Sequence, residues 1–370
     1  MTEKHRSDFP ATASGLDALV LCGSSALRML RAQRRKTGFL PWEQTGLAEQ
    51  RSLLAQTVPR TDSIDVPWLV RIGAFDSEHD DLLHLLVGNA SNRRCGDGFA
   101  PHVCTADLPP GSIARVEPYL YTLTPEALCA QIANELGPVV AFALAMEFCS
   151  GISLSDHSEW LPPYRCMRHT PLSKEKAESD AVGYFEVEPV MTPAGLESYL
   201  AKVRRGRGAS RLRELCCYLV SDLRSPMECI MVSMFSLPTV EGGFACGPFK
   251  GDHKVMFDVR ARAVSGMPYA ICDAYQAEAR LDFEYNGGEG HTSDSSRLHD
   301  EKRNAGLTTM GIEVLIVNKE TLRDLEAMEA LAWRIYKRKG KRYRNRVDGR
   351  RELQTALLNV LRTSFGLLPA

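Results

Sequence analysis

Acidic side chains alternate with apolar ones in a short stretch, 281–286, that follows another acid, Asp273, through a tight turn. Successive side chains of a strand point to opposite faces, so this stretch would bury one face and present Asp282, Glu284 and Asn286 on the other. Carboxylate oxygens held on adjacent strands are the ligands that a hard divalent cation such as Mg²⁺ prefers. The pattern therefore predicts a metal site with the chemistry of metal-assisted phosphodiester cleavage.

The elements that must hold these residues follow from the hydrophobic pattern and from turn and cap signals. Ser225 followed by Pro226 predicts a helix start, because Ser caps the first turn and Pro fits its first position. From there the pattern predicts the order helix, strand, strand, strand, helix, strand, helix. The expected strands cover residues 254–259, 269–273, 279–285 and 313–317. This order predicts an α/β sandwich around a central sheet.

Six short motifs within residues 225–332 occur in an order that is typical of one group of nucleases. They are an acid on the second strand, Glu-x-polar-Gly on the third, a histidine, Asp-x-x-Arg on the next helix, and a Leu and a Gly before the last strand. The residues concerned are Asp273, Glu284, Asn286, Gly287, His291, Asp300, Arg303, Leu307 and Gly311. This order resembles the PD-(D/E)XK nuclease superfamily and, within it, the small domains related to very-short-patch-repair endonucleases. The resemblance implies a restriction-endonuclease-like α/β sandwich.

The resemblance also implies roles for individual residues. Asp273 and Glu284 would hold one or two Mg²⁺ (or Mn²⁺) ions, and Glu228 on the preceding helix could reach the metal or its water shell. Asn286 departs from the Lys that the superfamily usually has at this position to orient water and offset charge. His291 could replace that Lys in proton transfer, since the ordinary pKa of histidine lies near neutrality.

Each of these residues also has a structural explanation. Glu284 could be a surface strand residue paired with Arg280, and Asp273 could be a turn former. Glu228 suits the positive end of a helix dipole. His291 could be an ordinary loop residue, and Asp300 could form a local ion pair with the Arg one turn later.

Ten Lys and Arg residues and a single acid lie between Arg334 and Arg351. Such density is typical of segments that contact nucleic acid phosphates. The side chains expected to bind nucleic acid are Arg303, Lys337, Arg338, Lys339, Lys341, Arg342, Arg344 and Arg346. Tyr336 and Tyr343 lie among them and could pack on sugars or bases. The structural alternative is a solvated helix face.

The composition is that of an ordinary soluble globular protein, with 44% hydrophobic and 25% charged residues and a net charge of −1. No run of eighteen apolar residues and no secretion signal is present, which predicts a cytoplasmic protein without a membrane span. Eleven scattered cysteines fit a reducing compartment. The alternative is a zinc site formed by Cys95, His102 and Cys104, with His84 as a further candidate.

The chain is long enough for several domains. Thr124 before Pro125 predicts a helix start, and the apolar runs 68–70 and 82–87 predict strands. We expect a mixed α+β recognition or regulatory domain, a connecting segment, a nuclease-like domain and a basic helical segment, at residues 1–151, 152–205, 206–332 and 333–370. The stretch 85–151, chiefly through its residues 123–126, resembles the regulatory half of abortive-infection antitoxin-like proteins. That similarity implies DNA or partner recognition in phage defence or a mobile element.

Two functions from different classes follow. The first is a metal-dependent endonuclease that hydrolyses phosphodiester bonds of DNA, with the basic segment gripping phosphates. The second is a catalytically inactive nuclease-fold DNA-binding regulator or antitoxin-like protein, in which the acids are structural. Asn286 favours the second, whereas the intact pair Asp273 and Glu284 favours the first. Both functions are compatible with a protein partner or with a homodimer.

Overall fold

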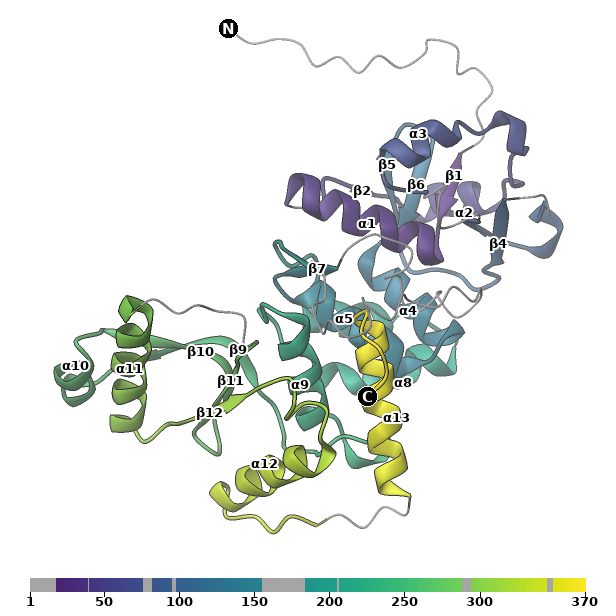
Figure 1. The fold of residues 1–370 in the computed structure, drawn as a ribbon. Helices are drawn as coiled ribbons and strands as arrows, with labels where there is room; N and C mark the ends of the chain where they lie inside the picture. Colours follow the sequence, from purple (N-terminus) through teal and green to yellow (C-terminus); the bar gives the residue numbers. More distant parts are fainter. Residues whose placement is uncertain are drawn as a thin grey trace, which may run out of the picture.

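A computed structural model describes residues 18–38, 40–75, 82–94, 98–154, 184–204, 206–287, 294–344 and 349–370. Within these ranges the chain is a mixed α/β protein, as the hydrophobic pattern predicted. A six-stranded sheet forms in the N-terminal part and a four-stranded sheet in the C-terminal part. Figure 1 shows that a group of helices lies between the two sheets.

The N-terminal sheet has the strand order β2-β5-β6-β1-β3-β4. Its strands are β1 (Leu19–Leu21), β2 (Glu43–Gln44), β3 (Leu83–Val87), β4 (Phe99–Val103), β5 (Ile113–Glu117) and β6 (Leu120–Leu123). The central strand β1 pairs in parallel with β6 and antiparallel with β3, and all three of its side chains are buried. The associated helices are α1 (Gly23–Thr37), α2 (Leu47–Leu54) and α3 (Val66–Arg71).

The prediction of a strand at residues 68–70 was wrong, because this stretch lies in the short helix α3. The Asp65 side chain accepts a hydrogen bond from the backbone N–H of Trp68, and Pro67 occupies the first turn. A side-chain cap and a proline at this position favour a helix over a strand despite the apolar run. The strand predicted at 82–87 is confirmed by β3, and the helix start at Pro125 is confirmed by α4 (Pro125–Glu135).

The middle of the molecule is helical. It contains α4, α5 (Pro138–Cys149), the short strands β7 (Ile152–Leu154) and β8 (Tyr184–Glu186), α7 (Pro193–Leu200), α8 (Arg207–Leu215) and α9 (Pro226–Ser236). The last helix, α13 (Arg350–Ser364), packs against α5 and α9. One cluster of buried apolar side chains extends from Leu19 to Leu367, so both ends of the described chain contribute to the same core.

The C-terminal sheet has the order β12-β11-β10-β9. Its strands are β9 (Lys250–Met256), β10 (Tyr269–Gln276), β11 (Leu281–Tyr285) and β12 (Glu313–Val317). The pairs β9–β10 and β10–β11 are antiparallel, whereas β11 and β12 are parallel. The helices of this part are α9 before β9, α10 (Val259–Ser265) before β10, α11 (Asp294–Thr309) between β11 and β12, and α12 (Leu325–Arg338) after β12. The sequence predicted this order except for α10.

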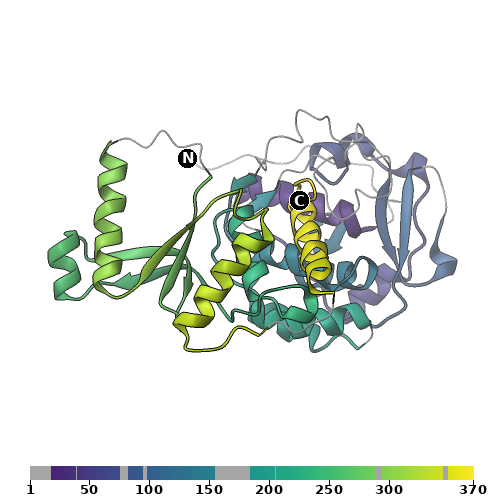
Figure 2. The same cartoon turned by 60° about the horizontal axis from the view of Figure 1, so that its bottom comes forward.

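Helices pack on both faces of the C-terminal sheet. Leu281 and Phe283 of β11 belong to the main core, where the Phe283 ring lies 5.3 Å from that of Phe235 on α9. A second, smaller core joins Cys272 of β10 to Leu307 of α11. Figures 1 and 2 both show α10 and α11 side by side at the end of the molecule that is far from the N-terminal sheet.

Candidate functional site

Strands β10 and β11 separate at the position of the two predicted metal ligands. Their pairing ends at Ala274 and Phe283. Beyond this pair, β10 continues along β9 and β11 continues along β12, so the two strands diverge. Asp273 and Glu284 are the next residues on their strands, so each is the first residue beyond the last pair, on its own side of the fork of the sheet.

A guanidinium group from helix α11 lies in this fork. Arg303 donates hydrogen bonds to Asp282 Oδ2 at 3.1 Å and to the backbone oxygen of Ile271 on β10 at 3.2 Å. It also forms an ion pair with Glu284, and its side chain is only 13% exposed. One side chain of α11 therefore connects both strands of the fork. The sequence placed Arg303 among the nucleic-acid contacts, whereas the structure places it among the candidate metal ligands.

The alternation along β11 places the acids on the face opposite the main core, as predicted, but it does not expose them equally. Asp282 is fully buried, whereas the Glu284 side chain is 18% exposed. Burial raises the pKa of Asp282, and the opposing effects come from Arg303 and from hydrogen bonds to Cys272 and the Ala274 backbone. The buried carboxylate thus depends on Arg303 for its charge balance.

Asp273 is half-buried, and both acids and arginines lie near it. Burial raises the pKa of Asp273 most, Asp282 raises it further, and Arg303 lowers it. Asp252 adds to the rise in the pKa and Arg224 opposes it. These two neighbours form an ion pair of their own at 2.7 Å. The fork therefore gathers carboxyl groups in excess of cations.

Glu228 lies in the first turn of helix α9 and takes part in a capping box. The Ser225 hydroxyl accepts from the backbone N–H of Glu228 and donates to Glu228 Oε1 at 2.7 Å. The backbone N–H of Arg224 donates to Glu228 Oε2 at 2.9 Å. This reciprocal arrangement explains Glu228 as a helix cap. The carboxyl also belongs to the acidic neighbourhood, because burial raises the pKa of Glu228 and Asp273 raises it further.

Replacing Glu228 by Gln is expected to change the pH dependence of stability. The pKa of Glu228 in the folded protein is above its ordinary value, so the folded state binds this proton more tightly than the unfolded state. The associated stability is present at pH below the ordinary pKa and is lost as the pH rises through the raised pKa. Glu228→Gln cannot ionise, so its unfolding midpoint in urea should fall less over this range. If the urea midpoints of the wild type and of Glu228→Gln changed equally with pH, the prediction would be wrong.

Two residues were predicted to orient water or transfer protons, Asn286 and His291, and the structure adds a third residue near the fork, His253. Asn286 is exposed just beyond β11, and its backbone N–H donates to the oxygen of Val317. His291 lies outside the described residues. His253 of β9, which the sequence analysis did not select, pairs with Cys272 in the sheet and stacks on the Tyr275 ring at 4.9 Å. The predicted strand began at residue 254, one position too late to include this histidine.

The carboxyl groups at the fork fit a hard divalent cation. In the described part of the chain, no three His, Cys, Asp or Glu side chains already converge as ligands. Mg²⁺ binds through one or two carboxylates and keeps several waters, so a pair such as Asp273 and Glu284 is a sufficient donor set. The guanidinium of Arg303 already stands between Asp282 and Glu284 as a positive charge. The fork therefore holds one guanidinium group between two of its carboxyl groups.

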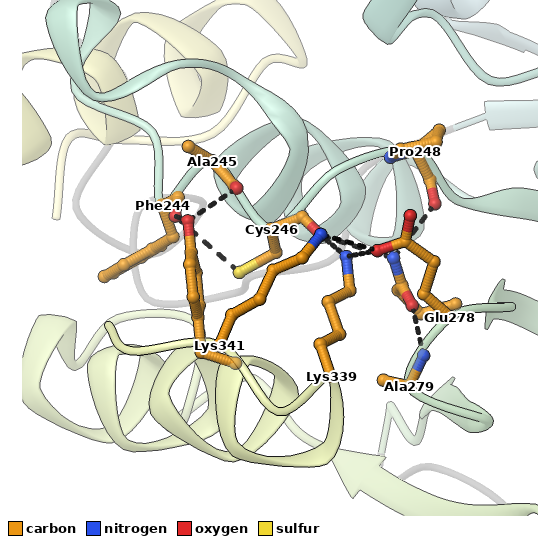
Figure 3. Close-up of polar contacts among 10 residues, drawn as sticks. Phe244, Ala245, Cys246, Pro248, Glu278, Ala279, Lys339 and Lys341 are labelled. Carbon is orange, nitrogen blue, oxygen red and sulfur yellow. Dashed lines mark hydrogen bonds and ion pairs between the residues drawn. The ribbon is translucent and has the colours of Figure 1, made fainter. Parts of the chain in front are cut away.

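Part of the predicted basic segment is committed to contacts within the protein, as Figure 3 shows for two of its lysines. Lys339 donates to the backbone oxygen of Cys246 and pairs with Glu278 at 3.1 Å, and its side chain is only 5% exposed. Lys341 pairs with the same carboxylate at 3.3 Å. Arg338 donates to the backbone oxygen of Ala279 at 3.1 Å. These three basic side chains connect the end of α12 to the β10–β11 turn and to the loop before β9.

The other basic residues of this segment have different environments. Arg342 and Arg344 are exposed, and Lys337 lies over the Trp333 ring. Arg346 lies outside the described residues. The Tyr336 hydroxyl donates to the backbone oxygen of Ala245 at 2.8 Å, which holds this ring against the protein. Lys337, Arg338 and Lys341 are exposed as well, but each of them has a contact within the protein.

The histidines of the alternative zinc site come together in the N-terminal sheet. His84 Nδ1 and His102 Nε2 lie 2.8 Å apart, and His102 Nδ1 lies 3.0 Å from Glu135 Oε1. The thiol of Cys104 donates to the backbone oxygen of Ala106. Cys95 lies outside the described residues. An N–H···N hydrogen bond between the two rings accounts for the arrangement without a metal.

Comparison of the chain with family models, with curated proteins and with solved structures gave no match. No helix in the described ranges is both long enough and apolar enough to cross a membrane.

Proposed function

We propose that the chain is a metal-dependent endonuclease that hydrolyses phosphodiester bonds of DNA, with its catalytic site at the β10–β11 fork. The observation that carries the proposal is that Asp273 and Glu284 directly follow the last pair, Ala274 and Phe283, at the point where the two strands stop pairing. Apart from the additional helix α10 between β9 and β10, the order α9, β9, β10, β11, α11, β12 supports it further, because the same order of elements underlies the resemblance to the PD-(D/E)XK nucleases.

Asp273 and Glu284 would hold Mg²⁺ or Mn²⁺, which polarises the phosphate and lowers the pKa of a bound water when it is present. Arg303 supplies a fixed positive charge that the neutral Asn286 cannot supply. Asp282 holds Arg303 in place through the hydrogen bond of 3.1 Å. Glu228 fixes the start of α9 beside Asp273 and adds to the negative potential that attracts a divalent ion.

Exposed arginines of the C-terminal segment would position the DNA backbone. Replacing Arg342 and Arg344 by Ala is expected to reduce the slope of log K against log salt by roughly one for each phosphate that is no longer neutralised. Lys339→Ala should leave this slope unchanged, because Lys339 is buried against Cys246 and Glu278. Fluorescence anisotropy of a labelled duplex, measured at several salt concentrations, checks both expectations. An unchanged slope for the arginine pair would remove this segment from the interface.

The test of the proposal is cleavage of plasmid and short duplex DNA by the full chain with Mg²⁺ or Mn²⁺. Ca²⁺ and EDTA serve as controls, and single-stranded DNA and RNA of the same sequence define the substrate class. We expect cleavage of DNA that requires Mg²⁺ or Mn²⁺. Folded protein that cleaves none of these substrates with either ion would overturn the endonuclease proposal.

A second candidate function is a catalytically inactive nuclease-fold regulator that binds DNA. Two observations favour it: the neutral Asn286 lies just beyond β11, and Arg303 forms ion pairs with both Asp282 and Glu284. In this case the carboxylates would serve only as partners that fix α11 on the sheet. Salt-sensitive DNA binding without cleavage would select this function.

A further inference from the structure

The fork of the sheet contains its own cation, and this cation contacts a residue proposed to bind metal. Arg303 joins the fully buried Asp282 and the partly exposed Glu284. A divalent cation bound to Glu284 would place two cations, the metal ion and the guanidinium, next to one carboxylate. At a few ångströms such charges repel each other, and the low exposure of both side chains limits screening by water.

We propose that Arg303 occupies, in the metal-free protein, the position on Glu284 that a divalent cation takes, so that guanidinium and metal compete for this carboxylate. The inference rests on the proposed function, because it assigns Glu284 to the metal. It makes Arg303 a positioning residue that keeps the acids of the fork neutralised until the ion arrives.

The contacts of Arg303 divide into two groups, which gives the exchange a defined outcome. The hydrogen bonds to Asp282 and to the Ile271 backbone oxygen do not involve a proposed metal ligand. They can keep the guanidinium in the fork after Glu284 has been released. Guanidinium has five N–H donors, so the group freed from Glu284 can donate to a phosphate oxygen of the substrate. The same side chain would then serve first as a counter-ion and afterwards as a phosphate contact.

The experiment measures Mn²⁺ affinity without nucleic acid, by electron paramagnetic resonance or calorimetry, in the wild type and in Arg303→Met. We expect the variant to bind Mn²⁺ about tenfold more tightly, because the competing charge is gone. The single variant Arg303→Met leaves the buried carboxylate of Asp282 without its counter-charge, and this loss can unfold the protein. The double variant Asp282→Asn/Arg303→Met removes both charges and keeps the side-chain volumes, so it provides the same comparison in a folded protein.

Two further variants assign the effect to this site. Arg334→Met removes an arginine that pairs with Glu313 on the neighbouring strand, and its Mn²⁺ affinity should match the wild type. Adding Glu284→Gln to the double variant should abolish the tightened binding. Affinity in the folded double variant that is equal to or weaker than in the wild type would overturn the competition while leaving the metal site intact. Absence of Mn²⁺ binding in every variant would overturn the competition together with the proposed metal site.

Discussion

Replacing Glu284 by Gln is expected to lower the rate of metal-dependent DNA cleavage by at least about 100-fold, which corresponds to roughly 2.7 kcal/mol of transition-state stabilisation. The amide keeps the shape of the side chain but removes the negative charge that would hold the ion at the fork. Asp273→Asn should have an effect of similar size from the other strand. The rate is measured from plasmid nicking under single-turnover conditions, with the metal at a saturating concentration.

The matched control is Glu313→Gln on the parallel neighbour β12. Glu313 is also a partly exposed strand acid that pairs with an arginine, Arg334, but its partner comes from α12. This variant should cleave within a factor of about two of the wild type, since surface ion pairs contribute little. Cleavage by Glu284→Gln at the wild-type rate would show that the fork is not the catalytic site.

Replacing Glu147 by Gln is expected to lower the free energy of unfolding by about 3–5 kcal/mol, because it leaves a buried arginine without its counter-charge. Arg31 of α1 donates to Glu147 of α5 through two parallel bonds of 2.9 Å and 2.6 Å, and both side chains are almost fully buried. The same carboxylate accepts from the backbone N–H of Leu154. It also opposes the effect of burial on Arg34, which lowers the pKa of that group to about 10.

Urea unfolding followed by circular dichroism measures this change, with Asp62→Asn as the control. Asp62 pairs with Arg60 at 3.2 Å, but both side chains are about 70% exposed, so the change should stay within about 0.5 kcal/mol. Arg31→Met combined with Glu147→Leu should recover most of the stability, because it removes both buried charges together. A decrease of less than about 1 kcal/mol in Glu147→Gln would show that Arg31 finds another partner.

Local signals in the sequence predicted several elements of the candidate site correctly. Ser225 caps α9 and Pro226 occupies its first turn, as expected from residue types that satisfy or lack a backbone donor. The predicted strand at residues 313–317 coincides with β12. The helix α10 was missed because it is short, although Asp258 caps it through the N–H of Ala261.

Other features could not be predicted because they depend on where distant segments meet. The arginines of α1 recur at every third position, which is typical of a solvated helix face, yet Arg34 is fully buried and donates to the backbone oxygens of Ser150 and Glu188. Lys339 was predicted to contact phosphate because it lies in a basic segment. In the structure its ammonium group donates to the backbone oxygen of Cys246, in the loop before β9. In both cases the partner lies more than ninety residues away in the chain.

The sequence by itself determined the class of fold, the order of elements around the C-terminal sheet apart from α10, and the alternation that directs Asp282 and Glu284 away from the main core. These depend on local periodicity and on caps, which act over a few residues. The tertiary structure alone decided that β10 and β11 diverge at Asp273 and Glu284 and that Arg303 lies between the acids. The physical reason is that sheet register and helix packing bring together charges from separate elements, and burial then strengthens their interaction.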